Sequence, residues 1–178
     1  MQHAAHVLVA YGSKHGSTAE IAERIGERLR EAGHDVDVRP ARSVDDLGPY
    51  DAVVLGGAVY MARWNRDARR LLKRQRRQLA ERDVWLFSSG PVGEDQPGTE
   101  RWSRPKFVEK MMPRVGAHEH IVFGGRVPTD PRSFAARAMA RNTPPDLQDR
   151  RDWQAIDNWG KWIGETLLYR EGSSRRQD

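Results

Sequence analysis

Short apolar runs recur along the chain, separated by stretches with helical spacing. Four of these runs lie at Val7 to Tyr11, Ala52 to Leu55, Val84 to Phe87 and Ile121 to Phe123. Runs of this length without alternation are typical of strands buried on both faces of a sheet. A fifth segment, His34 to Val38, alternates polar and apolar residues and predicts an edge strand.

The segment after the first strand has the pattern of an amphipathic helix. Ile21, Ile25 and Leu29 lie four residues apart, which places them on one helical face. Ser17, with Glu20 three residues later, has the spacing of a capping box. We therefore predict that Ser17 is the N-cap of this helix.

Three further helices are predicted. They run from Asn65, as a cap, to Arg82, from Pro105 to Met112 with a stop at Pro113, and from about Asp152 to Tyr169. The residues expected on the buried stripes of the two longer helices are Ala68, Leu71, Leu72, Leu79, Trp153, Ile156, Ile163 and Leu167, with Trp159 as a further candidate.

Strands that alternate with helices in this way indicate an α/β fold. Right-handed connections then build a doubly wound three-layer sandwich around a five-stranded parallel sheet with the order 2-1-3-4-5. Residues 1–170 are expected to form a single domain, and residues 171–178 a disordered basic tail.

The loop between the first strand and its helix, Gly12 to Thr18, is made of small and polar residues. It lies where backbone N–H groups and the helix dipole attract an anion. It contains neither the GKS or GKT triplet of nucleotide-triphosphate loops nor the G-x-G-x-x-G spacing of dinucleotide-binding folds. The remaining interpretations are a cradle for one phosphate and an ordinary, well-capped turn.

The sequence YGSKHGSTAE, from Tyr11 to Glu20, resembles the phosphate loop of the flavodoxin family, which also follows the first strand. The resemblance covers about residues 1–170 and implies a flavodoxin-like fold with flavin mononucleotide (FMN) as cofactor. The residues that it matches to the phosphate-binding positions are Ser13, Lys14, His15, Gly16, Ser17 and Thr18.

Two later loops extend the resemblance. In flavodoxins the loop after the third strand packs against the flavin ring, and the corresponding residues here are Ala58, Val59, Tyr60, Met61 and Trp64. A flat ring stacks on a flat side chain, so we expect Tyr60 or Trp64 to do so, unless Trp64 only covers the base of the next helix. In the loop after Phe87, the resemblance implies a cofactor-binding segment that includes Ser88, with hydrogen bonds to the flavin's pyrimidine carbonyls from Ser89, Gly90 and Gly93.

Composition limits the chemistry that the chain itself can supply. It has no cysteine, which excludes a thiol nucleophile and iron–sulfur ligation, so redox chemistry requires a bound cofactor. We expect no transmembrane segment and a cytoplasmic location, with peripheral membrane contact as an option. We also expect no metal site, because the histidines have no ligand spacing and resemble scattered surface residues, namely His3, His6, His34, His118 and His120.

The net charge is +5, and seven basic residues fall between Arg66 and Arg77 with Asp67 as the accompanying acid. Such a row is either a solvated face or a landing surface for a partner protein, an anionic lipid headgroup or the acidic tail of a cofactor. We expect no nucleic acid, because no aromatic residues are interleaved for base stacking.

Residues 126–151 lack a regular pattern, apart from a helical turn expected at Ser133–Ala140, and a connection of this length is often functional. With the basic surface and Asp152-Trp153 at the start of the last helix, the layout is similar to the menaquinone-dependent protoporphyrinogen dehydrogenase branch of the flavodoxin superfamily. That branch would imply a porphyrin-type substrate and a quinone partner. Its long segment is apolar and aromatic, whereas this one is shorter and polar.

These features predict an FMN-binding redox protein that exchanges electrons with a partner protein or a quinone, or acts as a small flavin oxidoreductase. We assign no catalytic residue, because a flavin transfers electrons without an acid–base group from the protein. One alternative is a protein that binds the deazaflavin F420, whose acidic tail would suit the arginine-rich helix. The other is a cofactor-free interaction module on the same fold.

Overall fold

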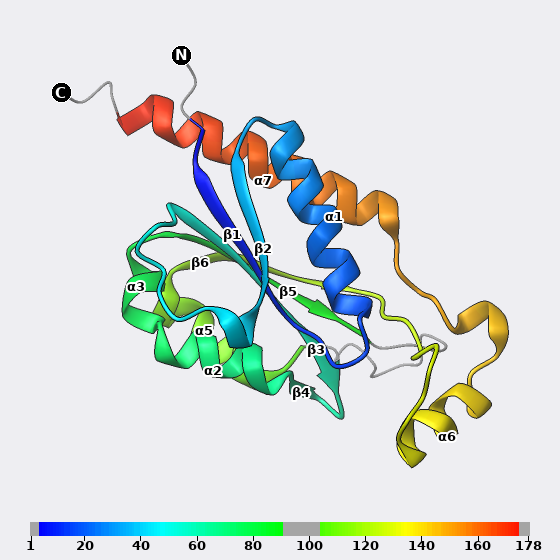
Figure 1. The fold of residues 1–178 in the computed structure, drawn as a ribbon. Helices are drawn as coiled ribbons and strands as arrows, with labels where there is room; N and C mark the ends of the chain where they lie inside the picture. The colour runs from blue at the N-terminus through cyan, green and yellow to red at the C-terminus, as the bar shows by residue number, and fades with distance from the viewer. Residues whose placement is uncertain (1–3, 91–103, 175–178) are drawn as a thin grey trace.

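Our computed structural model describes residues 4–90 and 104–174, which are drawn as a coloured ribbon in Figure 1. The parallel strands within them are β1 (His6–Gly12), β2 (Asp35–Pro40), β3 (Ala52–Tyr60), β5 (Asp83–Ser89) and β6 (Ala117–Phe123). Their order is β2-β1-β3-β5-β6, which confirms the predicted order of the five strands. The two-residue strand β4 (Arg63–Trp64) pairs antiparallel with the end of β3, and the sequence pattern does not predict it.

Helices cover both faces of this sheet, as a doubly wound fold requires (Figure 1). One face carries α1 (Ser17–Glu31) and α7 (Trp153–Ser174), and the other carries α2 (Arg66–Arg74), α3 (Arg76–Ala80) and α5 (Lys106–Val115). The short helix η1 (Ala41–Ser43) follows β2 and contacts α2.

The central strands supply both cores, because successive side chains point to opposite faces. In β1, Val7 and Val9 pack with α1 and α7, whereas Leu8 and Ala10 pack with the α2 and α3 layer. The apolar runs are therefore buried on both sides, as predicted. The helical positions predicted to be buried are also buried, except that Trp153 is 36% exposed.

Three helix boundaries differ from the sequence pattern. The helix predicted from Asn65 to Arg82 is divided at Gln75, whose buried side-chain amide donates to the Asp45 carbonyl at 2.7 Å. Helix α5 passes through Pro113 and ends at Val115, because a proline near the end of a helix removes one hydrogen bond without ending it. Helix α7 continues to Ser174, so part of the expected disordered tail is helical.

Residues 126–151 form an excursion at the edge of the sheet, and its helix α6 lies apart from the other helices (Figure 1). They contain α6 (Phe134–Asn142), where a helical turn is predicted, and the short helix η2 (Pro145–Leu147). Two backbone hydrogen bonds close its base, from Val127 N–H to the Gln148 carbonyl at 2.7 Å and from Arg150 N–H to the Gly125 carbonyl at 2.9 Å. Among the described residues, no helix is both long and apolar enough to cross a bilayer.

Candidate functional site

The three loops singled out from the sequence leave the sheet side by side. Gly12 of β1 is paired with Gly57 of β3, and Gly57 is paired with Ser88 of β5. At this carboxyl edge the chain turns from β1 into α1 on one face and from β3 towards α2 on the other. The loops therefore meet at the topological switch point, where ligands of doubly wound folds bind.

The first loop is closed by its own serine. The Ser13 hydroxyl oxygen accepts a hydrogen bond from Gly16 N–H at 3.0 Å, and Gly16 has a left-handed backbone with φ of 88°. Gly16, and not Ser17, is the N-cap of α1, so the predicted capping box is wrong. The left-handed turn at Gly16 brings Ser17 into the first helical turn, and the N–H groups there have no acceptor within the helix.

Two hydroxyl groups at this helix start are buried and have no hydrogen-bond partner among residues 4–90 and 104–174. They are the Ser17 Oγ and the Thr18 Oγ1, and Thr18 is 1% exposed. A buried hydroxyl without a partner costs about 1–3 kcal/mol, so a bound ligand or an ordered water that bonds it stabilises the site. The hydroxyl donors, the open N–H groups and the positive end of the α1 dipole together fit a phosphate.

The two charged residues of the loop, Lys14 and His15, are exposed at its rim. The pKa of His15 lies below its ordinary value, because partial burial and then the charge of Lys14 disfavour the imidazolium form. The imidazole is thus biased towards its neutral form, which donates one hydrogen bond.

The second segment is a strand and hairpin, where the sequence predicts a loop. Strand β3 continues to Tyr60, Met61 and Ala62 form the turn with φ of 48° and 58°, and β4 returns to pair Trp64 with Val59. Two positive φ angles at neighbouring non-glycine residues are uncommon. The turn leaves Tyr60 52% exposed and Met61 73% exposed at its tip.

Trp64 belongs to the core and does not line the open edge. It is 2% exposed, and a Cβ at Gly57 would lie 2.6 Å from its indole ring. Trp64 therefore fills the space beneath Gly57 on the α2 side of the sheet. Tyr60 is left as the aromatic residue that can face a ligand.

The third segment is fixed by a buried pair of polar side chains. Ser88 Oγ lies 2.8 Å from His120 Nε2 of β6, and both residues are buried. Burial, and to a smaller extent the charge of Arg104, lowers the pKa of His120 to about 4. Gly90 N–H donates to the Phe123 carbonyl at 3.0 Å, and its φ of 122° suits a glycine. Gly93 lies outside the described residues.

Two of the histidines expected on the surface are buried. His120 holds Ser88, and His34 accepts the Ala5 N–H at Nδ1 (3.2 Å) while its Nε2 lies 2.9 Å from the Gly164 carbonyl. Neither position is marked in the sequence, because each partner lies on another element far along the chain. In the part of the chain that the structure describes, no group of histidines and acids could hold a metal ion.

A cluster of charged residues missed from the sequence fastens residues 126–151 to α1 beside the first loop. Arg151, with a side chain 4% exposed, donates to both carboxylate oxygens of Asp149 at 2.8 and 2.6 Å and also to Glu20. Arg126 donates to the same Glu20 at 2.9 Å. These pairs lower the pKa of Glu20, with the hydrogen bond from Arg151 as the largest cause. The carboxylate of Glu20 therefore bonds two arginines and does not form the predicted capping box.

Comparison with known proteins agrees with this geometry. The flavodoxin domain family matches residues 8–144. A curated flavodoxin from Nitratidesulfovibrio vulgaris (strain DSM 19637 / Miyazaki F) is 48% identical over 44 residues, which are 25% of this chain and 30% of that protein's length.

Solved structures share the fold at low sequence identity. The oxidised Flavodoxin 2 from Bacillus cereus is 18% identical, with a TM-score of 0.60 over 94% of this chain and 99% of that one. Rubredoxin oxygen:oxidoreductase from Desulfovibrio gigas is 14% identical with the same TM-score, over 93% of this chain but only 37% of that one. The family match covers well over half of the chain, and this chain therefore belongs to the flavodoxin domain family.

Proposed function

We propose that this chain binds FMN at the carboxyl edge of its sheet and acts as a redox protein, carrying electrons or serving as a small flavin oxidoreductase. The observation that carries the proposal is the pair of buried, unpartnered hydroxyls of Ser17 and Thr18 at the N-terminus of α1. A phosphate monoester supplies the acceptors that these donors need. Membership of the flavodoxin domain family supports FMN as the molecule that carries this phosphate.

The described residues divide into two groups around the cofactor. Phosphate binding is proposed for Ser13, Gly16, Ser17 and Thr18, with Lys14 and His15 at the rim. Contact with the flavin ring is proposed for Ala58, Val59, Tyr60, Met61, Ser89 and Gly90. The contact predicted for Gly93 remains a prediction. Ser88 contributes its backbone, since its hydroxyl is engaged by His120. When bound, FMN accepts and releases electrons, which is chemistry that no side chain here supplies.

The first test is an absorbance spectrum of the purified chain, followed by mass spectrometry of any ligand that heat releases. We expect an oxidised flavin spectrum and the mass of FMN. The FMN-free chain should also bind FMN far more tightly than riboflavin, which lacks the phosphate. A deazaflavin spectrum would replace FMN by the F420 alternative, and a colourless chain that takes up neither cofactor would leave the interaction module.

Thr18→Val distinguishes an effect on phosphate binding from an effect on the fold, because it removes the unpartnered hydroxyl and keeps the shape of the side chain. The Kd for FMN should rise about tenfold or more, as expected for the loss of a hydrogen bond to a charged group. The FMN-free chain should lose no stability and gain up to about 1 kcal/mol, since an unsatisfied buried group disappears.

Thr166→Val on α7 is the matched control, because its hydroxyl donates to the Trp162 carbonyl far from the cradle. It should leave the Kd for FMN unchanged. The proposal is wrong if Thr18→Val destabilises the FMN-free chain while the affinity for FMN stays at the wild-type value.

A further inference from the structure

The outer surface of α2 and α3 carries a row of exposed cations, here called the arginine face. Its members are Arg66, Arg69, Arg70, Lys73, Arg74, Arg76 and Arg77. With Asp67 as the accompanying acid, residues 66–80 have a net charge of +6, against +5 for the whole chain. Within residues 4–90 and 104–174, Arg74 is the one member with an ion pair, a 3.9 Å contact to Asp45, which is itself 92% exposed.

A small pocket opens on this face between α2 and η1. Arg42, Arg70 and Arg74 line it together with Asp67, and Ala41 and Leu71 complete its wall. Its volume is about 90 Å³, against the roughly 10–15 Å³ of accessible volume that a single water molecule needs, so it has room for a carboxylate group. Arg74 is held in place by a hydrogen bond to the Val44 carbonyl. Three arginines and one aspartate give the lining a net charge of +2, which suits a carboxylate, and arginine can bind a carboxylate in a bidentate manner.

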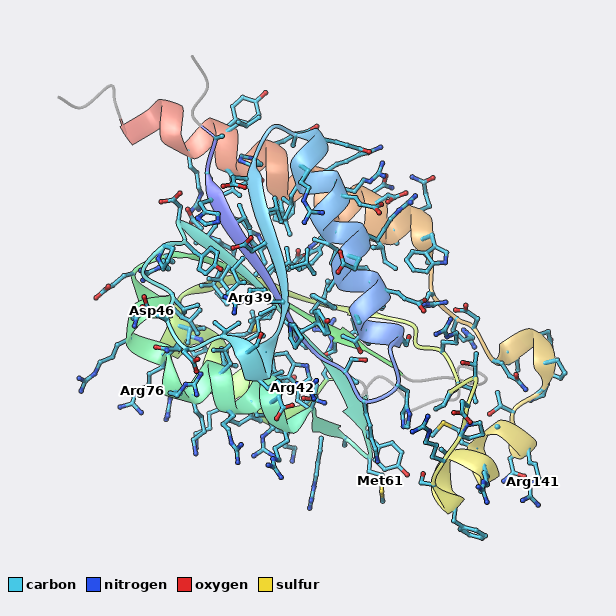
Figure 2. The ribbon with its side chains drawn as sticks, in the orientation of Figure 1. Arg39, Arg42, Asp46, Met61, Arg76 and Arg141 are labelled. Carbon is cyan, nitrogen blue, oxygen red and sulfur yellow. The ribbon has the colours of Figure 1, made fainter. Side chains whose placement is uncertain are left out.

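The arginine face adjoins the proposed cofactor site. Asn65, the cap of α2, lies so close to β1 that a Cβ at Gly12 would be 2.2 Å from its Oδ1. Arg70 is five residues further along α2, a rise of about 7.5 Å. Figure 2 shows Arg42 and Arg76 on this layer, with Met61 at the tip of the hairpin that precedes α2. Met61 is an exposed apolar residue next to the charged arginine face. Protein–protein contacts likewise combine apolar residues with a polar surround.

We propose that the arginine face and the hairpin tip form a docking surface for an acidic electron-transfer protein, one of whose carboxylates enters the pocket between Arg42, Arg70 and Arg74. The proposal rests on the proposed function. One electron leaves the reduced partner, which is thereby oxidised, and enters the bound FMN, which is reduced. A bilayer is a poorer occupant, because the apolar residues of α2, namely Ala68, Leu71 and Leu72, are all buried and cannot insert into lipid.

The test uses an acidic [2Fe–2S] ferredoxin as the probe partner and the full chain loaded with FMN. Stopped-flow mixing with the reduced ferredoxin gives the second-order rate constant of flavin reduction. We expect this constant to fall steeply as salt is raised, and Arg70→Glu to lower it about five- to tenfold at low salt, since steering depends on charge near the contact. Lys161→Glu, the same charge change on α7 across the sheet, should alter it less than twofold.

A second readout does not depend on the redox reaction. Calorimetric titration of oxidised ferredoxin into the chain, with and without FMN, should give binding that Arg70→Glu weakens and Lys161→Glu leaves unchanged. Arg70-dependent binding by a chain that takes up no FMN would refute the proposed function and support the docking surface. Equal effects of the two variants on an FMN-loaded chain would overturn the docking surface alone. Arg70-dependent sedimentation with phosphatidylserine vesicles, without ferredoxin binding, would replace the protein partner by a membrane.

Discussion

The two helical layers of the molecule use their charged residues in different ways. Between α1 and α7, Arg24 donates to both carboxylate oxygens of Asp157 at 2.6 and 2.9 Å, and Arg28 Nε lies 3.4 Å from Oδ1 of the same carboxylate. The helices approach closely, since a Cβ at Gly160 would lie 2.9 Å from the Cβ of Arg28. On α2 and α3, by contrast, seven exposed cations share a single distant ion pair among the described residues.

This difference follows from what each helix packs against. An arginine at the border between two packed helices meets carboxylates of its neighbour and becomes part of the fold. The arginines on the outer side of α2 and α3 meet solvent, a backbone carbonyl or a ring, and Arg74 alone among the described residues also has a carboxylate within 4 Å. Their charge therefore remains available to an approaching anion. We interpret charges that already form ion pairs as part of the fold, and a surface of unpaired positive charges as a binding surface for an anionic partner. Three predictions follow, from the largest expected effect to the smallest, and the second and third test this division.

The largest effect is expected in the sheet between the two layers, where acid should lower the stability of the fold through His120. The pKa of His120 is about 4 in the folded chain and 6.5 by its ordinary value. Between these two values the unfolded chain binds a proton that the folded chain does not, so stability is complete above pH 6.5 and falls as the pH drops towards 4. At about 1.4 kcal/mol per pKa unit, the full loss is about 3 kcal/mol.

Urea unfolding at neutral pH and near the lower end of this window measures that loss. His120→Gln is the control, because its amide can still bond Ser88 but does not titrate. The variant should lose much less stability on acidification than the wild type. Equal losses would mean that His120 does not titrate in this window.

The next effect is expected beside the layer of α1 and α7, where Arg151 bonds Glu20 of α1. Arg151→Met keeps most of the side-chain volume and removes the side-chain hydrogen bonds to Asp149 and Glu20. The free energy of unfolding should fall by about 2 kcal/mol, less than for a fully buried pair because both carboxylates are about half exposed. Urea unfolding at neutral pH is the measurement.

The smallest effect is expected on the arginine face. Arg70→Met makes the same chemical change at an exposed position that has no ion pair within the described part of the chain, so the free energy of unfolding should stay within about 0.5 kcal/mol of the wild type. Urea unfolding of Arg151→Met and Arg70→Met under the same conditions compares the loss of stability at a paired and at an unpaired arginine. Equal destabilisation by Arg151→Met and Arg70→Met would remove the distinction between paired and unpaired charge.

The sequence by itself determines the strand order, the buried stripes of the helices and the three segments around the candidate site. These features are local, since a run of apolar residues or a four-residue spacing reports the surroundings of its own strand or helix. The cap at Asn65 belongs with them, because its Oδ1 accepts from the N–H groups of Asp67 and Ala68 only two and three residues away.

Only the tertiary structure decides which side chains of the site are free. Trp64 and Tyr60 are equal candidates for stacking until the hairpin places Trp64 beneath Gly57 and leaves Tyr60 exposed. In the same way, Ser88 is engaged by His120, and Glu20 by Arg126 and Arg151, from more than 30 residues away. A local pattern can show that a residue is polar, but its partner is chosen by the order in which distant strands and helices come together.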